Sequence, residues 1–148
     1  FGIIYMCMNF CYYITNINFP FESSFNHYFI ILTAILVVFL DFVLDPIAVD
    51  EKRWEWDSPG IYYGVPILNF FGWLIVPVVV LFLFEQLFQP VIISIFSYSS
   101  LFQYAPGLLF IFLPIIASRP CFERGLVIPG YIGVITSFLY FFIVINKY

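Results

Sequence analysis

Five long apolar runs, nearly free of charged side chains, constrain the fold more than any other feature of this sequence. A helix needs about 20 apolar residues to cross the hydrocarbon core of a bilayer, and the runs approach or exceed that length. Backbone amides in lipid must be hydrogen-bonded within their own segment, and the runs lack the alternation of barrel strands, so we expect helices. The candidate spans are Phe1–Ile17, Tyr28–Leu44, Gly64–Phe84, Val91–Ala117 and Gly125–Ile145. The sequence therefore predicts an all-α fold, a polytopic transmembrane helix bundle with about five spans.

The composition agrees with a membrane-embedded chain. Hydrophobic residues make up 64% of the sequence and charged residues 9%, whereas roughly a quarter of the residues in soluble domains are charged. Membrane lipid is an expected partner, and the lack of a Lys/Arg stripe argues against nucleic acid. The single histidine, His27, argues against multi-histidine metal sites and haem, so we predict no metal. Cys7 and Cys11, one helical turn apart, are interpreted as apolar packing residues.

The basic residues predict how the chain is oriented. The run Val91–Ala117 is ambiguous in length, and a single crossing is preferred because it leaves only Lys147 opposite the other basic residues, as the positive-inside rule favours. Those residues are Lys52, Arg53, Arg119 and Arg124. We therefore expect a multi-pass protein of the cell (plasma) membrane, with the loop 45–63 in the cytoplasm and the loops carrying Glu22 and Glu85 outside.

Residues 1–148 are expected to form a single transmembrane domain. The first run, Phe1–Ile17, is fully apolar from its first residue and has no basic flank, which is typical of a truncated span and not of a signal peptide. Near the other end, Cys121 is expected in a short loop between two spans.

One polar segment, Asp41–Trp73, concentrates the chemically capable side chains. It covers under a quarter of the length, yet it holds six of the nine acidic residues and all three tryptophans. These residues are Asp41, Asp45, Asp50, Glu51, Glu55, Asp57, Trp54, Trp56 and Trp73. A simple membrane anchor has no need of such a cluster, so we expect the functional site here.

Asp41 and Asp45 are four residues apart, which places both carboxyl groups on nearly one face of a helix. Pro46 disfavours helical geometry at the residue before it, so the helix is predicted to end near Leu44 with Asp45 at its mouth. Asp41 then lies about one turn deeper, and a charge costs ~2.5 to 3.5 kcal/mol at mid-bilayer and less near the interface. We expect its carboxyl group to face the bundle interior in the neutral form.

Asn69 and Asp41 lie at similar distances along the sequence from the two ends of the predicted loop, Asn69 from Gly64 and Asp41 from Asp45. Two antiparallel helices joined by the intervening loop would bring Asn69 level with Asp41, so we predict a hydrogen-bonded pair that orients the acid. The structural alternative is that Asn69 only joins two helices.

The aromatic residues of the segment are expected near the membrane surface. Trp54, Trp56, Tyr62 and Tyr63 lie in the predicted loop, and Trp73 follows Asn69 by one helical turn. Lining a substrate site is one interpretation, and anchoring the protein in the interfacial belt is the other.

The motifs of this segment are DFVLDPIAV, a W-x-W pair at Trp54 and Trp56, and GIYYGVPILNFFGW ending at Trp73. In this order they resemble the membrane carotenoid biosynthesis family of bacteria and archaea, whose members include hydratases of gamma-carotene and bisanhydrobacterioruberin. The resemblance is dense from Asp41 to Trp73 and only hydrophobic elsewhere. Family members are longer, so the resemblance implies that this chain corresponds to a C-terminal part.

The resemblance implies addition of water across the terminal double bond of an acyclic carotenoid, without a cofactor. In that reaction Asp41 is the candidate proton donor, and Asp45 is the candidate that orients water and accepts its proton. The remaining candidates hold geometry or line the carotenoid, with cation–π stabilisation of the carbocation worth ~2 kcal/mol when desolvated. They are Asn69, Trp54, Trp56, Tyr62, Tyr63 and Trp73.

Two other functions stay open, and other carotenoid enzymes are candidate partners in each case. The first is a carotenoid-binding or assembly subunit without catalysis. The second is a proton or ion transporter with Asp41 as a relay, against which the sequence shows one intramembrane charge and no inverted repeat.

Overall fold

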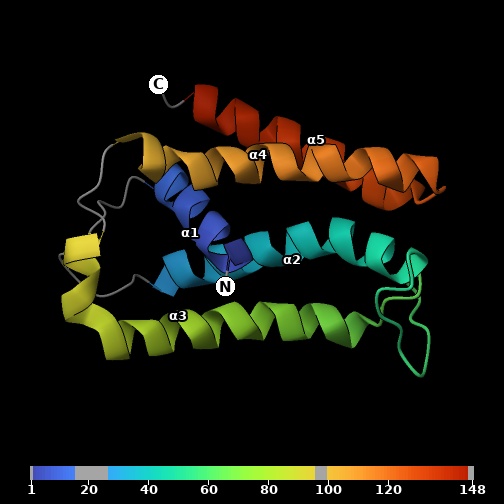
Figure 1. Cartoon of the computed structure of the whole chain (residues 1–148), viewed down its shortest axis with the longest axis horizontal. Helices are drawn as coiled ribbons and strands as arrows, with labels where there is room; N and C mark the ends of the chain where they lie inside the picture. Colours follow the sequence, from blue (N-terminus) through green and yellow to red (C-terminus); the bar gives the residue numbers. More distant parts are fainter. Residues whose placement is uncertain (1, 16–26, 96–99, 147–148) are drawn as a thin grey trace. The chain divides into compact units, whose positions relative to one another are not determined.

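The computed structural model describes residues 2–15, 27–95 and 100–146. In three parts of these ranges, 12–15, 88–95 and 100–104, it describes the backbone only. Its secondary structure consists of five helices and two isolated bridges. The helices are α1 Gly2–Thr15, α2 His27–Asp50, α3 Ile67–Ile95, α4 Ser100–Glu123 and α5 Val127–Ile145 (Figure 1).

Four helices in the described part of the chain are long and apolar enough to cross a membrane. They are His27–Asp50, Ile67–Leu87, Ala105–Glu123 and Val127–Ile145. The apolar part of α1, Gly2–Cys11, is shorter. The prediction of an all-α membrane bundle is confirmed. The first of the five expected spans is the one whose described helix is too short to cross a membrane.

Contacts divide the chain into two compact units. Unit 1 comprises Phe1–Val37 and Leu74–Phe110, and unit 2 comprises Val38–Trp73 and Ile111–Tyr148. Helices α2, α3 and α4 therefore each contribute one part to each unit. The residues of the polar segment from Asp41 to Trp73 all belong to unit 2.

The core of unit 1 forms around α1. The rings of Phe10 and Phe110 lie 5.3 Å apart between centroids. The Thr33 hydroxyl donates to the Phe29 carbonyl (2.8 Å) and to Cys11 Sγ (3.3 Å). Both Cys11 and Cys7 are buried free thiols, as the packing interpretation expects.

The core of unit 2 lies between the second half of α2 and the end of α4. Val43 and Ile47 from α2 pack with Ala117 and Cys121 from α4 and with Leu126 of the following turn. Cys121 is thus a fully buried residue of a helix, and its predicted place in a loop is wrong.

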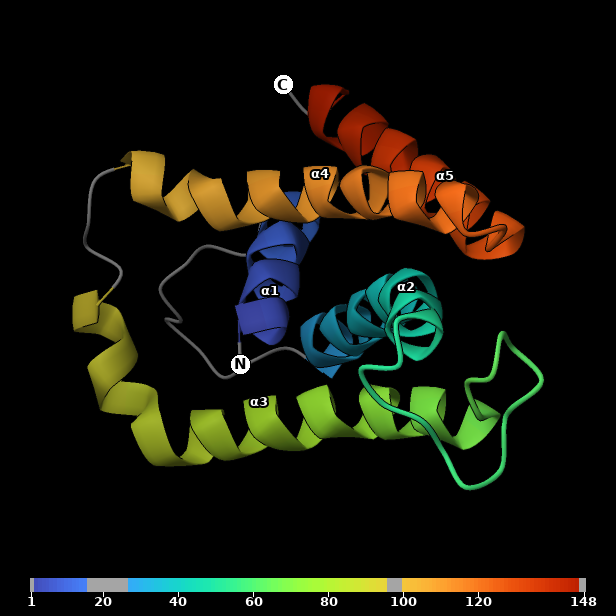
Figure 2. The same cartoon turned by 45° about the vertical axis from the view of Figure 1, so that its right-hand side comes forward.

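Helix α5 returns along the second half of α4 (Figure 2). A Cβ atom added at Gly133 would lie 2.5 Å from the Pro114 carbonyl oxygen and 2.3 Å from Ser118 Oγ. The two helices therefore approach each other more closely than a larger residue would permit, as small residues allow in membrane helix pairs.

Helix α2 does not end near Leu44 as predicted, because it continues through Pro46 to Asp50. Its end is a Schellman motif, in which the Arg53 amide donates to the Ala48 carbonyl and the Lys52 amide to the Val49 carbonyl, each at 2.9 Å. Lys52 takes the left-handed conformation (φ 54°) that this motif requires. The first part of the predicted loop 45–63 is therefore helical.

A side chain from elsewhere in unit 2 compensates for the proline. Pro46 has no N–H, so the Phe42 carbonyl lacks its helical donor. The Tyr62 hydroxyl donates to that carbonyl at 2.9 Å. The Cys121 thiol lies 3.8 Å from the next carbonyl, that of Val43, as an additional weak donor. With the Phe42 carbonyl satisfied, the helix continues past the proline, where local sequence rules predict its end.

The end of α2 is tied to the turn between α4 and α5. Arg124 Nε lies 3.1 Å from Asp50 Oδ2, and Arg124 Nη2 lies 2.6 Å from Glu51 Oε1. The C-terminal ends of α2 and α4 therefore lie on the same side of unit 2, which agrees with a single crossing of the membrane by α4.

One further expectation is wrong in detail. Helix α3 begins at Ile67 and runs to Ile95, so Glu85 is a buried helical residue and not part of an outer loop. Helix α4 covers much of the run Val91–Ala117 and passes through Pro106 without ending. Glu22 and Lys147 lie outside the described residues.

Candidate functional site

The centre of the site is a pair of buried carboxyl groups held by one amide. Asn69 Nδ2 donates to Asp41 Oδ2 at 3.1 Å and, at shorter range, to Asp45 Oδ2. Asp41 is 8% exposed and Asp45 3%. The predicted hydrogen bond between Asn69 and Asp41 is confirmed, and the same amide nitrogen also binds Asp45.

The position predicted for Asp45 at an aqueous mouth is wrong. Because α2 continues to Asp50, Asp45 lies more than one turn inside the helix and is buried. Its neighbours Val43 and Ile47 pack toward α4, while Asp41 and Asp45 face Asn69 in the first turn of α3. The helical spacing of four residues thus gives α2 one polar and one apolar contact face.

The electrostatics of the pair favour a shared proton. Two ionised carboxylates bound to one nitrogen repel each other, so the arrangement suits one proton and one negative charge across the pair. The amide donor and the N-terminal end of α3, which carries the positive end of the helix dipole, both stabilise the single charge. A proton can therefore pass from one carboxyl group to the other without a change in the net charge of the pair.

A tight turn delivers Asn69 to this position. Residues 62–65 form a turn in which the Val65 amide donates to the Tyr62 carbonyl (2.9 Å), with Tyr63 and Gly64 at φ 49° and 84°. Two consecutive positive φ values define a type I′ turn. Gly60 must be glycine, since a Cβ there would lie 2.0 Å from the Val65 carbonyl oxygen.

Four aromatic rings gather beside the carboxyl pair. Phe42 stacks on Phe70 with centroids 4.3 Å apart, and Tyr62 meets both edge-on at 5.4 and 5.7 Å. Tyr63 packs against Tyr62 at 5.3 Å, and its hydroxyl accepts a bond from the Ile128 amide in the first turn of α5. Burial raises the pKa of Tyr62, so its hydroxyl remains a donor.

The three tryptophans are placed differently. Trp54 is 45% exposed in the loop after α2, and Trp56 and Trp73 are part-exposed. In the described part of the chain no ring contact or hydrogen bond joins any of them to the carboxyl pair. Their predicted role as substrate-lining residues stays a prediction.

Sequence reasoning missed Phe42 and Phe70. Each directly follows a predicted polar residue, Asp41 or Asn69 respectively, and this repeated polar–aromatic dipeptide was the available signal. In a chain with 21 phenylalanines that signal is weak, because phenylalanine at any one position is unremarkable.

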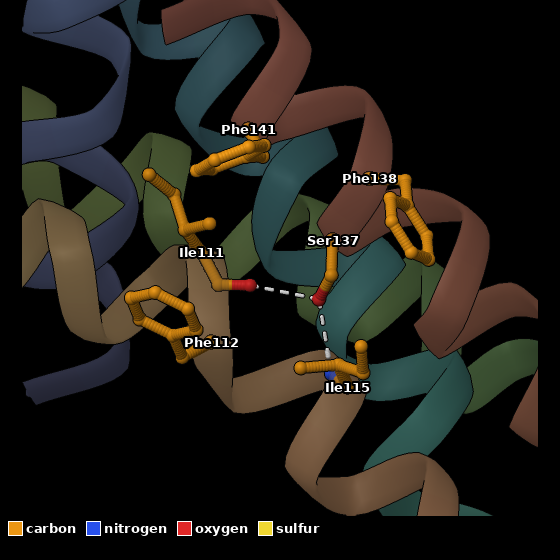
Figure 3. Close-up of a pocket in the computed structure, with 6 residues that line it drawn as sticks. All are labelled: Ile111, Phe112, Ile115, Ser137, Phe138 and Phe141. Atoms are coloured by element: carbon orange, nitrogen blue, oxygen red, sulfur yellow. Dashed lines mark hydrogen bonds between the residues drawn. The ribbon is translucent and has the colours of Figure 1, made fainter. Parts of the chain in front are cut away.

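A separate apolar cavity of about 190 Å³ lies between α4 and α5 (Figure 3). Ile111, Phe112, Ile115, Ser137, Phe138 and Phe141 line it. The Ser137 hydroxyl bridges the Ile111 carbonyl (2.7 Å) and the Ile115 amide (2.9 Å), so both its donor and its acceptor capacity are engaged. The cavity can hold an apolar group but offers no side chain for chemistry.

The described residues contain no group of three or more His, Cys, Asp or Glu side chains that could hold a metal ion. The prediction of a site without metal or cofactor stays a prediction.

This fold and this site define a multi-span helical membrane protein with a buried carboxyl–amide centre. Residues 2–140 match the model of the carotenoid biosynthesis protein family, and the chain belongs to that family. The resemblance seen in the motifs from Asp41 to Trp73 is thereby confirmed at the level of the family. No curated protein and no solved structure matches the chain.

Proposed function

We propose that this carotenoid biosynthesis protein hydrates the terminal C=C bond of an acyclic carotenoid end group. A carboxyl group transfers its proton to the less substituted alkene carbon, which leaves a tertiary carbocation. Water bonds to the cationic tertiary carbon and loses a proton to the second carboxylate, giving a tertiary alcohol. The proton then returns to the first carboxyl group within the pair, so the site is unchanged after each turnover.

The observation that carries this proposal is the single amide bound to two buried carboxyl groups. Asn69 lies closer to Asp45 than to Asp41, and a stronger donor stabilises the ionised form of an acid. In the proposed mechanism Asp41 therefore holds the proton and donates it, and Asp45 is the base that receives the proton of water.

The aromatic cluster supports the same chemistry. A tertiary carbocation is stabilised by the faces of aromatic rings, by ~2 kcal/mol where water is excluded. Phe42 and Phe70 directly follow Asp41 and Asn69 in sequence, and the Tyr62 ring contacts both. These three rings are therefore further candidates beside the tryptophans. The proposal places the polyene in the membrane and its end group at this cluster.

The test is pigment production by the expressed protein in the membranes of cells that make an acyclic carotenoid. The wild type should add the mass of one water to an end group. Asp41→Asn and Asp45→Asn should each accumulate the unhydrated precursor with normal protein levels. Asp57→Asn, which makes the same change at an exposed loop carboxylate, should leave hydration intact.

Two other results would replace this proposal. Pigment that co-purifies without gaining water would favour a carotenoid-binding or assembly role, which the apolar cavity between α4 and α5 supports. Proton flux in liposomes that Asp41→Asn abolishes would favour a transporter. Asp45 and Glu85 are also buried within candidate spans, so the sequence argument that only one charge is intramembrane no longer holds. The proposal also places the protein in the plasma membrane, beside other carotenoid enzymes. The loop predicted at 45–63, which begins after Asp50 because α2 extends that far, faces the cytoplasm in this proposal.

A further inference from the structure

The Tyr62 hydroxyl occupies the place of a missing helical donor beside the carboxyl pair. Pro46 removes the N–H that would bind the Phe42 carbonyl, and Tyr62 binds that carbonyl at 2.9 Å. Asp41 directly precedes Phe42, and Asp45 directly precedes Pro46. The gap in the backbone ladder thus spans the same turn of α2 that carries both acids.

The same tyrosine also belongs to the turn that positions Asn69. Tyr62 opens the type I′ turn at residues 62–65, and the Asn69 backbone N–H donates to the Pro66 carbonyl (3.0 Å) at the start of α3. One side chain is therefore bonded to the helix of the acids while its backbone leads directly into the helix of the amide.

We infer that Tyr62 is a positioning residue, whose hydroxyl supplies the donor that α2 lacks at the Phe42 carbonyl and so holds both carboxyl groups where the Asn69 side-chain amide binds them. The hydroxyl acts through the Phe42 carbonyl, in addition to the place proposed for the Tyr62 ring beside the carbocation. A backbone N–H at position 46 would satisfy the same carbonyl and should therefore replace the hydroxyl in this role.

Removing the hydroxyl while keeping the ring tests this role. Tyr62→Phe retains the contacts with Phe42 and Phe70, but leaves the Phe42 carbonyl without a donor. Adding Pro46→Ala restores a backbone N–H that can bind the same carbonyl. Hydration of an acyclic carotenoid in liposomes should show kcat about ten- to a hundredfold lower for Tyr62→Phe with a similar KM. The double variant should recover most of the loss.

A second readout does not depend on hydration. The infrared carbonyl stretch of the protonated carboxyl group, assigned with Asp41→Asn and Asp45→Asn, should shift in Tyr62→Phe and return in the double variant. Tyr131→Phe, which removes an exposed hydroxyl on α5, should change neither readout. Tyr63→Phe should not be rescued by Pro46→Ala, because its hydroxyl binds the Ile128 amide instead.

The two readouts separate this inference from the proposed function, on which only the kinetic arm rests. If the wild type forms no hydrated product, the proposed function fails and the infrared band still decides the role of Tyr62. An unshifted band in Tyr62→Phe, or a shift that Pro46→Ala does not reverse in a folded protein, overturns the inference.

Discussion

Asn69 Nδ2 lies 3.1 Å from Asp41 Oδ2, although 28 positions separate the two residues in the chain. The contact crosses from the first turn of α3 to the middle of α2, and it brings Asp45 into the same hydrogen-bonded group. The site therefore forms only when α2 and α3 pack together, because the amide and its two acidic partners come from different helices.

Replacing Asn69 with alanine should affect both stability and activity. Two buried carboxyl groups would lose their donor, and an unsatisfied buried polar group costs about 1 to 3 kcal/mol. We expect a lower thermal midpoint in detergent and loss of hydrated carotenoid from expressing cells. Asn146→Ala removes an exposed asparagine whose side chain bonds to the Phe142 carbonyl of its own helix, so it should leave hydration intact and change the midpoint much less. An Asn69→Ala protein with wild-type stability would contradict the account of the pair.

Gly133 should not tolerate a side chain. An added Cβ would meet the Pro114 carbonyl oxygen at 2.5 Å, and overpacking of this kind costs about 1 to 3 kcal/mol. Gly133→Ala should lower the thermal midpoint. Gly72→Ala makes the same change in α3 with no heavy atom within 4 Å, and should be neutral or stabilising by about 0.5 to 1 kcal/mol. Equal effects at the two positions would count against close packing of α4 and α5.

Lys52→Gly should stabilise the protein. Lys52 holds the left-handed conformation at the C-terminal end of α2, which costs a residue with a Cβ about 1 to 2 kcal/mol and glycine almost nothing. The expected result is a higher midpoint in thermal unfolding. Arg53→Gly, at the next position, has no positive φ to relieve and should give no gain. A lower midpoint for Lys52→Gly would show that α2 ends elsewhere.

Arg124→Gln should lower stability slightly and in a salt-dependent way. The side chain joins Asp50 and Glu51 but is about one third exposed, so the two ion pairs together contribute about 1 kcal/mol or less. Unfolding midpoints should differ from wild type at low salt and converge at about 1 M salt, where screening is nearly complete. Arg119→Gln, whose partner Glu123 lies on the same helix, is the matched control and should have a smaller effect.

The sequence by itself determined the membrane helices and the central contact of the site. Uninterrupted apolar runs fix where helices cross, since lipid leaves the backbone few alternatives. Counting residues outward from one short loop placed Asn69 level with Asp41, because two antiparallel helices share the same rise per residue.

Only the tertiary structure decided how far α2 extends and what surrounds its acids. Pro46 predicts a helix end by local rules, yet the helix continues, because Tyr62, distant in sequence, supplies the donor that the Phe42 carbonyl lacks. That continuation buries Asp45, and the turn that Tyr62 opens brings Phe70 onto Phe42. Such donors and ring contacts arise from packing between segments that are distant in sequence, so local residue patterns cannot predict them.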